Sequence, residues 1–306
     1  MRRMHEKNKG LKEKDMKYNT IELKVPYEKA GLSGDGCNPV LVEYIAEQSQ
    51  EIDRHMRPAV LIIPGGGYEW VSEREGEPIA FALLTKGVQC YVLKYSCIRK
   101  SFPLDLLEAA TALAYIREHA LENDINPHDI AVMGFSAGGH LAASLAVHWN
   151  KNFVKEPLGF TEEHKPDSLI LAYPVIASTD THQGSIDNLL AEDSYLPLGG
   201  LESTFGIGYL KKEDREELIS LEKQVSADTP KSFIWHCADD GCVPVSNSLR
   251  FAAALNDHHI PFAMHIYQNG GHGLALGDEV TAKEESQINV DAAGWIKLVC
   301  DWIYRK

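Results

Sequence analysis

One serine lies in a pattern that is typical of a hydrolytic nucleophile. Ser136 is the centre of the G-x-S-x-G run 134–138, which directly follows the apolar run 130–133 and precedes an alanine-rich stretch. This order predicts a strand, a sharp turn and a helix, the context that a nucleophile elbow requires. A chance match to the five-residue pattern occurs in about one chain in ten of this length, so the surrounding context carries the prediction.

An acid and a base must accompany such a serine, because its hydroxyl attacks a carbonyl at neutral pH only when a base removes the proton and an acid orients the base. Where a chain carries this elbow, both partners follow the serine, each on a loop after a strand. Asp240 follows the apolar run 233–236, and His272 lies in a glycine-rich loop after the run 262–267. We therefore predict Ser136, Asp240 and His272 as the catalytic residues.

The acid has a direct neighbour that competes for the role. Asp239 and Asp240 are adjacent, and one of them must point elsewhere. We favour Asp240 because the run 240–244, which contains a glycine and a proline, is typical of a tight turn leading into the next helix. Asp239 is then expected to be a turn or capping residue.

A glycine-rich run supplies the donors that a developing oxyanion needs. Residues 64–68 read Pro-Gly-Gly-Gly-Tyr and directly follow the apolar run 60–63. We predict that the backbone amides of Gly66, Gly67 and Ala137 form an oxyanion hole, in which losing one donor typically costs about 3 to 4 kcal/mol. The alternatives are a flexible turn or a phosphate cradle, but neither G-x-x-x-x-G-K-[ST] nor G-x-G-x-x-G occurs here.

Short apolar runs alternate with helical patterns along the chain, and this order predicts the elements that position the site. Six runs predict parallel strands and two more amphipathic runs predict an antiparallel edge: 58–63, 88–94, 129–134, 168–173, 232–236 and 262–267, then 20–25 and 40–45. Apolar spacing near 3.6 predicts helices over 104–120, 136–148 and 288–304. We predict an α/β fold with a mostly parallel sheet of about eight strands and helices on both faces.

The stretch 176–230 breaks this alternation after the sixth strand, because its length far exceeds that of an ordinary crossover. We interpret it as an insertion that forms a lid, a pocket wall or a plain surface embellishment, with a charged helix over 210–224. Residues 18–306 are expected to form a single domain. Residues 1–17 carry seven Lys or Arg and three Asp or Glu, and we expect a flexible basic tail there.

The net charge and the cysteine content limit the classes of binding partner and the cellular compartment that we expect for this chain. The chain carries a net charge of −14, and the part after residue 17 is more acidic still, so we expect neither nucleic acid nor anionic membrane as a partner. The six cysteines show no C-x-x-C spacing, and no apolar stretch reaches membrane-spanning length. We expect no metal site and a reducing, cytoplasmic location.

The elbow region 125–142 and the loop 64–68 resemble those of α/β-hydrolase esterases related to acetylxylan esterases and to the hormone-sensitive-lipase-like acetyl esterases. The runs 173–176, 181–185 and 188–190 are similar to the acetylxylan-esterase-like branch, whereas Pro64 stands where the lipase-type loop begins with His. The resemblance covers nearly the whole chain from about residue 20. It implies that residues 181–188 lie near the active site, and Tyr68 and His182 are candidate substrate contacts.

Residues and resemblance together predict a serine carboxylic-ester hydrolase. The catalytic residues point to the chemistry, and the resemblance implies removal of short acyl groups, in particular acetyl, from carbohydrate esters. The expected partner is a small-molecule ester such as an acetylated sugar, no cofactor is required, and the oligomeric state is left open. Two alternatives are a prolyl-oligopeptidase-like serine peptidase, which shares the order of catalytic residues, and a non-catalytic hydrolase-fold binding protein.

Overall fold

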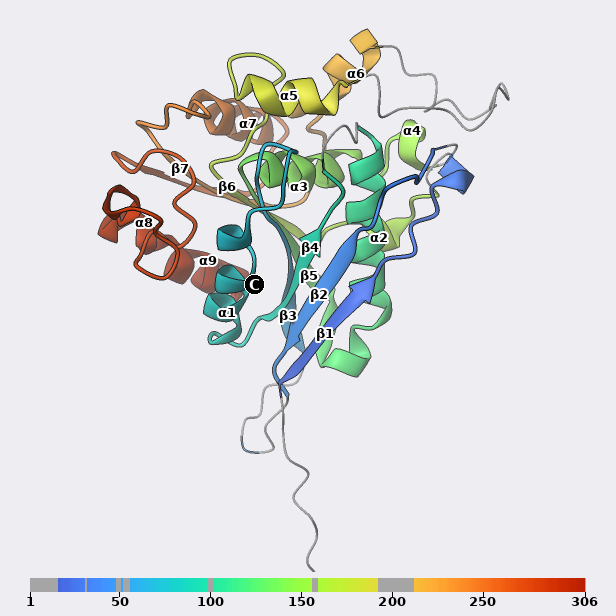
Figure 1. The fold of residues 1–306 in the computed structure, drawn as a ribbon, viewed down its shortest axis with the longest axis horizontal. Coiled ribbons are helices and arrows are strands. Elements are labelled where there is room, and N and C mark those ends of the chain that lie inside the picture. The colour runs from blue at the N-terminus through green and yellow to red at the C-terminus, as the bar shows by residue number, and fades with distance from the viewer. Residues whose placement is uncertain are drawn as a thin grey trace, which may run out of the picture.

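The architecture was taken from a computed structural model, which describes residues 16–30, 32–47, 51, 56–97, 102–155, 159–191 and 212–305. These residues build one eight-stranded sheet with the strand order β1-β2-β4-β3-β5-β6-β7-β8 (Figure 1). The strands are β1 (Lys17–Glu22), β2 (Val40–Ile45), β3 (Arg57–Ile63), β4 (Gln89–Lys94), β5 (Ile125–Phe135), β6 (Ser168–Ala172), β7 (Ser232–Cys237) and β8 (Phe262–Tyr267). All pairs from β4 to β8 are parallel, while β1 and β2 form the predicted antiparallel edge.

Helices cover both faces of the sheet, as predicted (Figure 1). They are α1 (Glu77–Leu84), α2 (Leu104–Glu118), α3 (Ser136–His148), α4 (Asn152–Lys155), α5 (Gln183–Leu189), α6 (Lys212–Leu218), α7 (Ser246–Asp257), α8 (Val290–Ala293) and α9 (Trp295–Ile303). Helices α2, α3 and α7 share one hydrophobic core with one face of the sheet, and α1 and α9 share a second core with the other face.

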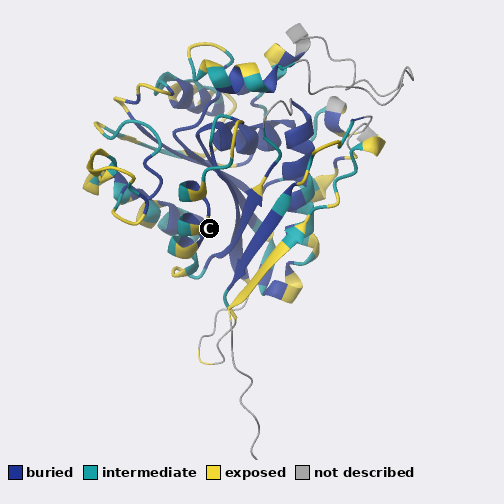
Figure 2. Ribbon diagram, viewed as in Figure 1, coloured by how far each residue is buried: buried dark blue, intermediate teal, exposed yellow. Residues whose placement is uncertain are grey.

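The central strands owe their composition to this double cover. Every residue of β3 is buried, as is every residue of β6 and β7, because helices pack against both faces (Figure 2). These strands therefore read as continuous apolar runs rather than alternating ones. The edge strand β1 is exposed along most of its length (Figure 2).

Several boundaries differ from the prediction. The first strand lies three residues earlier than expected, because β1 pairs with β2 and that pairing stops next to Pro39, which has no amide to donate. The predicted helix 288–304 is interrupted at Gly294 into α8 and α9. The predicted helix 210–224 ends at Leu218, and the amide of Leu221 instead donates to the carbonyl of Ile176. Helix α1 was not predicted.

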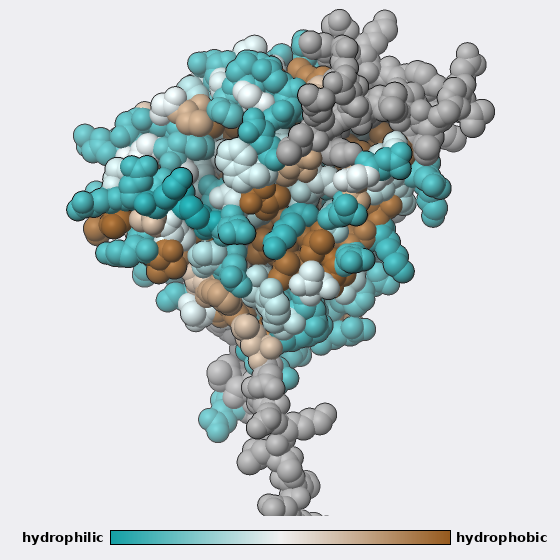
Figure 3. Space-filling model, in the orientation of Figure 1, coloured by the Kyte–Doolittle hydropathy of each residue, from teal (hydrophilic) through white to brown (hydrophobic). Residues whose placement is uncertain are grey.

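The insertion and the tail are described only in part. Residues 192–211 of the insertion and residues 1–15 of the tail lie outside the described residues, while Lys17 already belongs to β1. The described part of the insertion contains α5, α6 and the 3-10 turn Leu221–Lys223. In the view of Figure 3, hydrophilic side chains cover most of the margin and hydrophobic ones gather near the middle. Within the described ranges, no helix has both the length and the apolar character to cross a bilayer.

Candidate active site

Ser136 lies where β5 passes into α3, in a backbone conformation with φ of 51°. The flanking glycines are required because of the close approach of strand and helix. A Cβ atom on Gly134 would lie 2.1 Å from the carbonyl oxygen of Gly138, and one on Gly138 would lie 2.2 Å from that of Ile63. The elbow therefore presents Ser136 at the carboxyl edge of the sheet.

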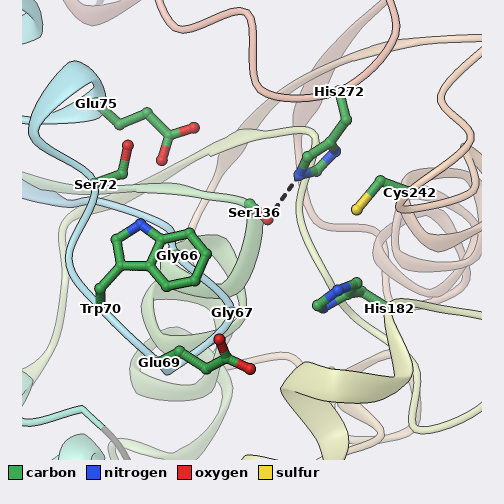
Figure 4. Close-up of a pocket in the computed structure, with 10 residues that line it drawn as sticks. All are labelled: Gly66, Gly67, Glu69, Trp70, Ser72, Glu75, Ser136, His182, Cys242 and His272. Carbon is green, nitrogen blue, oxygen red and sulfur yellow. Dashed lines mark hydrogen bonds between the residues drawn. The ribbon is translucent and has the colours of Figure 1, made fainter.

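The structure brings the three predicted catalytic residues together. Nε2 of His272 lies 2.8 Å from Oγ of Ser136, and Nδ1 of His272 lies 2.7 Å from Oδ2 of Asp240 (Figure 4). Asp239 points elsewhere, and its carboxylate accepts the amides of Gly270 and Gly271 at 3.2 and 2.9 Å. Asp239 thus supports the loop that carries His272, and Asp240 contacts the imidazole itself.

Asp240 is only 6% exposed and is surrounded by donors. Its Oδ1 accepts the amides of Cys242 and Val243 at 2.9 Å each, and its Oδ2 also lies 3.1 Å from Nε2 of His236. Burial alone would raise the pKa of Asp240, but the hydrogen bonds from His236, His272 and the Val243 amide outweigh burial and hold the pKa below its usual value. An ionised Asp240 accepts the Nδ1 proton of His272, which leaves Nε2 free to accept from Ser136.

His236 is a buried residue of β7 that the sequence analysis treated as part of a strand. Its Nδ1 lies 2.8 Å from Oγ of Ser248, and its Nε2 contacts the carbonyl of Val243 at 3.0 Å as well as Asp240. The carboxylate and the carbonyl are both acceptors, so the ring hydrogen lies on Nε2. Nothing in the apolar run around His236 distinguishes it from a core histidine.

The predicted oxyanion loop lies beside Ser136. Gly66 and Gly67 have φ values of 123° and 67°, a region that favours glycine, and both line the same cavity as Ser136. Among the described residues, neither of their amides has a hydrogen-bond acceptor. Ala137 is the second residue of α3, so its amide has no acceptor within the helix. The three predicted donors therefore have no competing acceptor in the described part of the chain.

The cavity around Ser136 has a volume of about 270 Å³ and a lining of mixed polarity. Its lining, drawn in Figure 4, consists of Gly66, Gly67, Glu69, Trp70, Ser72, Glu75, Ser136, His182, Cys242 and His272. Among the described residues, this lining contains two carboxylates and neither Lys nor Arg. The indole of Trp70 is 59% exposed, and in Figure 4 it lies across Ser136 from His182. The site therefore offers an apolar face at Trp70 and polar side chains at Glu69 and His182.

The insertion contributes His182 to this lining. His182 caps α5, and its Nδ1 accepts from the hydroxyl of Ser185 at 2.9 Å and from the Ser185 amide at 3.3 Å. The ring hydrogen therefore lies on Nε2. Asn188, on the same helix, donates to the carbonyl of Gly67 at 2.8 Å. The segment 181–188 thus both lines the cavity and holds the oxyanion loop.

Tyr68, the other predicted substrate contact, does not line the cavity. Its side chain is 2% exposed, and its hydroxyl lies 2.9 Å from Nδ1 of His140. Burial lowers the pKa of His140 to about 4, so the ring is neutral at pH 7, and its Nε2 donates to the carbonyl of Ile219. Tyr68 therefore bonds to His140 of α3, and His140 in turn bonds to the insertion. The backbone at Tyr68 has a φ of 62°, and its ring lies in the hydrophobic core.

Comparison with known proteins relates this architecture to a group of esterases. The sequence model of the family described as BD-FAE matches residues 48–255. Endo-1,4-beta-xylanase B from Butyrivibrio fibrisolvens is 36% identical over 228 residues, which is 73% of this chain and 33% of that protein. Acetylxylan esterase from Xylanibacter ruminicola is 28% identical over 79% of this chain and 45% of its own length.

A solved structure extends the similarity to almost the whole chain. The acetyl ester-xyloside bifunctional hydrolase from Caldicellulosiruptor lactoaceticus is 32% identical, with a TM-score of 0.73 over 93% of this chain and 94% of that one. The fold is that of the α/β-hydrolases, as the sequence predicted. The chain spans only about a third to a half of the two curated relatives, at 33% and 45% of their lengths.

Proposed function

The chain belongs to the BD-FAE family and is a carboxylic ester hydrolase, and from this premise we propose that it removes acetyl groups from carbohydrate esters with Ser136 as its nucleophile. The observation that carries the proposal is the continuous hydrogen-bonded path from Ser136, which lines the cavity, through His272 to the buried Asp240. Such a path activates a hydroxyl that would otherwise be a weak nucleophile.

Acylation follows from the proton positions described above. Oγ of Ser136 forms a bond to the ester carbonyl carbon while its proton passes to Nε2 of His272. The amides of Gly66, Gly67 and Ala137 donate to the oxyanion that develops, and Asp240 stabilises the imidazolium. The bond to the alcohol oxygen then breaks, His272 returns its proton to that oxygen, and the acyl group remains on Ser136.

Deacylation repeats these steps with water. His272 takes a proton from a water molecule, whose oxygen attacks the acyl carbon of the ester on Ser136. The tetrahedral intermediate again places its negative oxygen at the same amides. When it collapses, His272 protonates Oγ of Ser136 and the carboxylic acid departs. All protons are accounted for by the ester, the water and His272.

The cavity favours a short acyl group on a sugar alcohol. About 270 Å³ suits an acetyl group and part of a sugar ring, and the two carboxylates in the lining disfavour a long hydrocarbon chain. Trp70 offers a flat apolar face for the ring, while Nε2 of His182 and the carboxylate of Glu69 can bond to sugar hydroxyls. The names of the acetylxylan esterase and the acetyl ester-xyloside hydrolase support the same substrate class.

A panel of esters tests the proposal. The wild type and Ser136→Ala should be assayed on p-nitrophenyl acetate, p-nitrophenyl octanoate and acetylated xylo-oligosaccharides. We expect acetyl esters to be preferred over octanoyl esters and Ser136→Ala to lose about 10⁴-fold or more in kcat. Ser144→Ala is a matched control, because Ser144 lies in α3, is buried, and its hydroxyl has no partner among the described residues.

Two outcomes would overturn the proposal. Equal hydrolysis by wild type and Ser136→Ala would show that Ser136 is not the nucleophile, and faster cleavage of aminoacyl amides than of acetyl esters would indicate a peptidase.

The cytoplasmic location stays a prediction, which fractionation of cells that express the full-length protein would test.

A further inference from the structure

Glu75 is a buried carboxylate beside the nucleophile that the mechanism above does not use. It ends the 3-10 turn Glu73–Glu75, is 4% exposed and lines the cavity. Its Oε2 accepts the amide of Gly65 at 2.8 Å, and its Oε1 accepts the hydroxyl of Tyr173 at 2.8 Å. A buried charge is retained only when its hydrogen bonds compensate for lost hydration, so both contacts constrain their partners strongly.

Tyr173 continues this connection to the loop that carries His272. Its hydroxyl accepts the amide of Ala275 at 2.9 Å, and its ring packs edge-on against the imidazole of His272 with centroids 5.0 Å apart. Glu75 is therefore joined through one hydroxyl group to the backbone three residues beyond the base. The oxyanion loop, the end of β6 and the His272 loop meet at this carboxylate.

Arg74, the residue before Glu75, makes a second connection to the His272 loop. Its Nη2 donates to the carbonyl of Gly273 at 3.0 Å, and its Nε donates to the carbonyl of Thr281. Gly273 directly follows His272 in the chain. Two consecutive residues thus bind the His272 loop, one directly through its guanidinium and the other through Tyr173.

The atoms around Gly65 are packed so closely that Glu75 and the backbone of Gly65 have little room to move. A Cβ atom there would lie 2.8 Å from Oε2 of Glu75 and 2.9 Å from Cβ of Ser136. The amide that Glu75 holds is therefore packed directly against the nucleophile, one residue before Gly66 and its predicted oxyanion donor. Small movements of Glu75 would be transmitted to both Ser136 and the oxyanion amides.

We propose that Arg74 and Glu75 form a clamp of positioning residues, which fixes the oxyanion loop and the His272 loop relative to each other. The inference rests on the proposed function, because it assigns the clamp to catalysis by Ser136 and His272. Its effect should appear in the chemical step, since Arg74 does not line the cavity and both oxygens of Glu75 are engaged by the protein. Binding of a small ester should change little.

The test is a double-mutant cycle of Glu75→Gln and Tyr173→Phe, with kcat and KM measured on p-nitrophenyl acetate. Each single variant should lower kcat by about tenfold or more while KM stays within about threefold. The double variant should fall no further than the worse single one, because both changes break one continuous set of hydrogen bonds. Glu73→Gln is the matched control, because Glu73 lies in the same turn but is exposed, and its kcat should equal that of the wild type.

Independent readouts separate positioning from loss of folding. Tyr173→Phe removes a single oxygen atom, so it tests the clamp even if Glu75→Gln does not fold. The low-field proton resonance of His272 Nδ1 should shift or broaden in Tyr173→Phe while thermal unfolding stays cooperative. Arg74→Lys, which keeps the charge but loses the paired donors, should also lower kcat with little change in KM.

An unchanged kcat in folded Glu75→Gln and Tyr173→Phe, or effects that multiply in the double variant, would overturn the clamp. Failure of the proposed function would look different, because Ser136→Ala would then retain activity or acetyl esters would not be preferred. The clamp variants are compared with the wild type on any ester that the wild type hydrolyses. Failure of the clamp can therefore be distinguished from failure of the proposed function.

Discussion

Nε2 of His236 lies 3.1 Å from Oδ2 of Asp240, the same oxygen that His272 contacts at 2.7 Å. The acid of the predicted triad therefore serves two histidines, one facing the nucleophile and one buried in β7. This arrangement keeps Asp240 ionised and immobile. Substitutions at His236, which contacts Asp240 from the core, should therefore affect the active site.

Substitution of the two adjacent aspartates should separate their roles. Asp240→Asn should lower kcat on p-nitrophenyl acetate by about 10⁴-fold, because an amide cannot fix the tautomer of His272 as a carboxylate does. Asp239→Asn keeps an oxygen that can accept the amides of Gly270 and Gly271, and we expect a loss of about tenfold at most. A larger loss in Asp239→Asn than in Asp240→Asn would contradict the assignment.

Removal of the buried histidine should reduce stability. His236→Phe deletes one donor to Asp240 and leaves the hydroxyl of Ser248 without its partner. We expect the free energy of unfolding at pH 7 to fall by about 1 to 3 kcal/mol, measured by urea denaturation. Ser248→Ala removes only the outer contact and should cost less. Equal stability of His236→Phe and wild type would show that the contact to Asp240 contributes nothing.

Asp105 in α2 should make stability depend on pH. Burial, and to a smaller extent the neighbouring Glu108, raises the pKa of Asp105 to about 7, so the folded state holds a proton that the unfolded state releases near pH 4. The contribution of Asp105 to stability is therefore complete below pH 4, is lost as the pH rises toward 7, and stays lost above it.

The variant Asp105→Asn isolates this effect because an amide does not ionise. Relative to the wild type, it should gain stability between pH 4 and 7, reaching about 4 kcal/mol at most at pH 8. Paired urea denaturation curves at pH 4, 6 and 8 measure the difference, and all other titrating groups cancel in it. A difference that is constant with pH would show that Asp105 titrates alike in both states.

The exposed indole at the rim should matter for sugars and not for simple esters. Trp70→Ala should raise KM for acetylated xylo-oligosaccharides by about tenfold, because it removes the apolar face on which a ring can pack. The kcat and KM for ethyl acetate, which lacks a ring, should stay unchanged, and Trp70→Phe should restore part of the sugar affinity. An equal effect on both substrates would argue against a sugar platform.

The elbow glycine should be intolerant of even one methyl group. Gly134→Ala places a Cβ atom 2.1 Å from the carbonyl oxygen of Gly138, so strand and helix must separate. We expect a loss of about 3 kcal/mol or more in the free energy of unfolding. Gly241→Ala is the control, since a Cβ atom there meets no atom within 4 Å. Comparable melting temperatures for the two variants would refute the steric argument.

The sheet and the three central site residues could be predicted because both depend on local order. Parallel strands buried on two faces read as apolar runs, and the residues after them must meet at one edge of the sheet. Ser136 and Asp240 follow such strands, and His272 follows the partly exposed edge strand β8. The order of the motifs along the chain was therefore enough to predict that these three residues lie close together.

The remaining site residues depend on contacts that no local pattern records. Glu75 lies in a charged run that is typical of an exposed turn, and only its contact with Tyr173, 98 residues away, shows that it is buried. His236 reads as part of an apolar strand. For Tyr68 the sequence did not indicate that a turn with φ of 62° would direct the ring into the core. Tertiary contacts decided each of these cases.

The charge of the cavity has a consequence for the end of each catalytic cycle. Hydrolysis of a neutral ester leaves a carboxylate, and this anion forms in a space that Glu69 and Glu75 line, where the described part of the chain places neither Lys nor Arg. Like charges at short range repel, so the wall that accepts the uncharged substrate disfavours retention of the product. The two carboxylates oppose the attraction of the oxyanion amides for this anion, so added acetate should inhibit turnover only weakly.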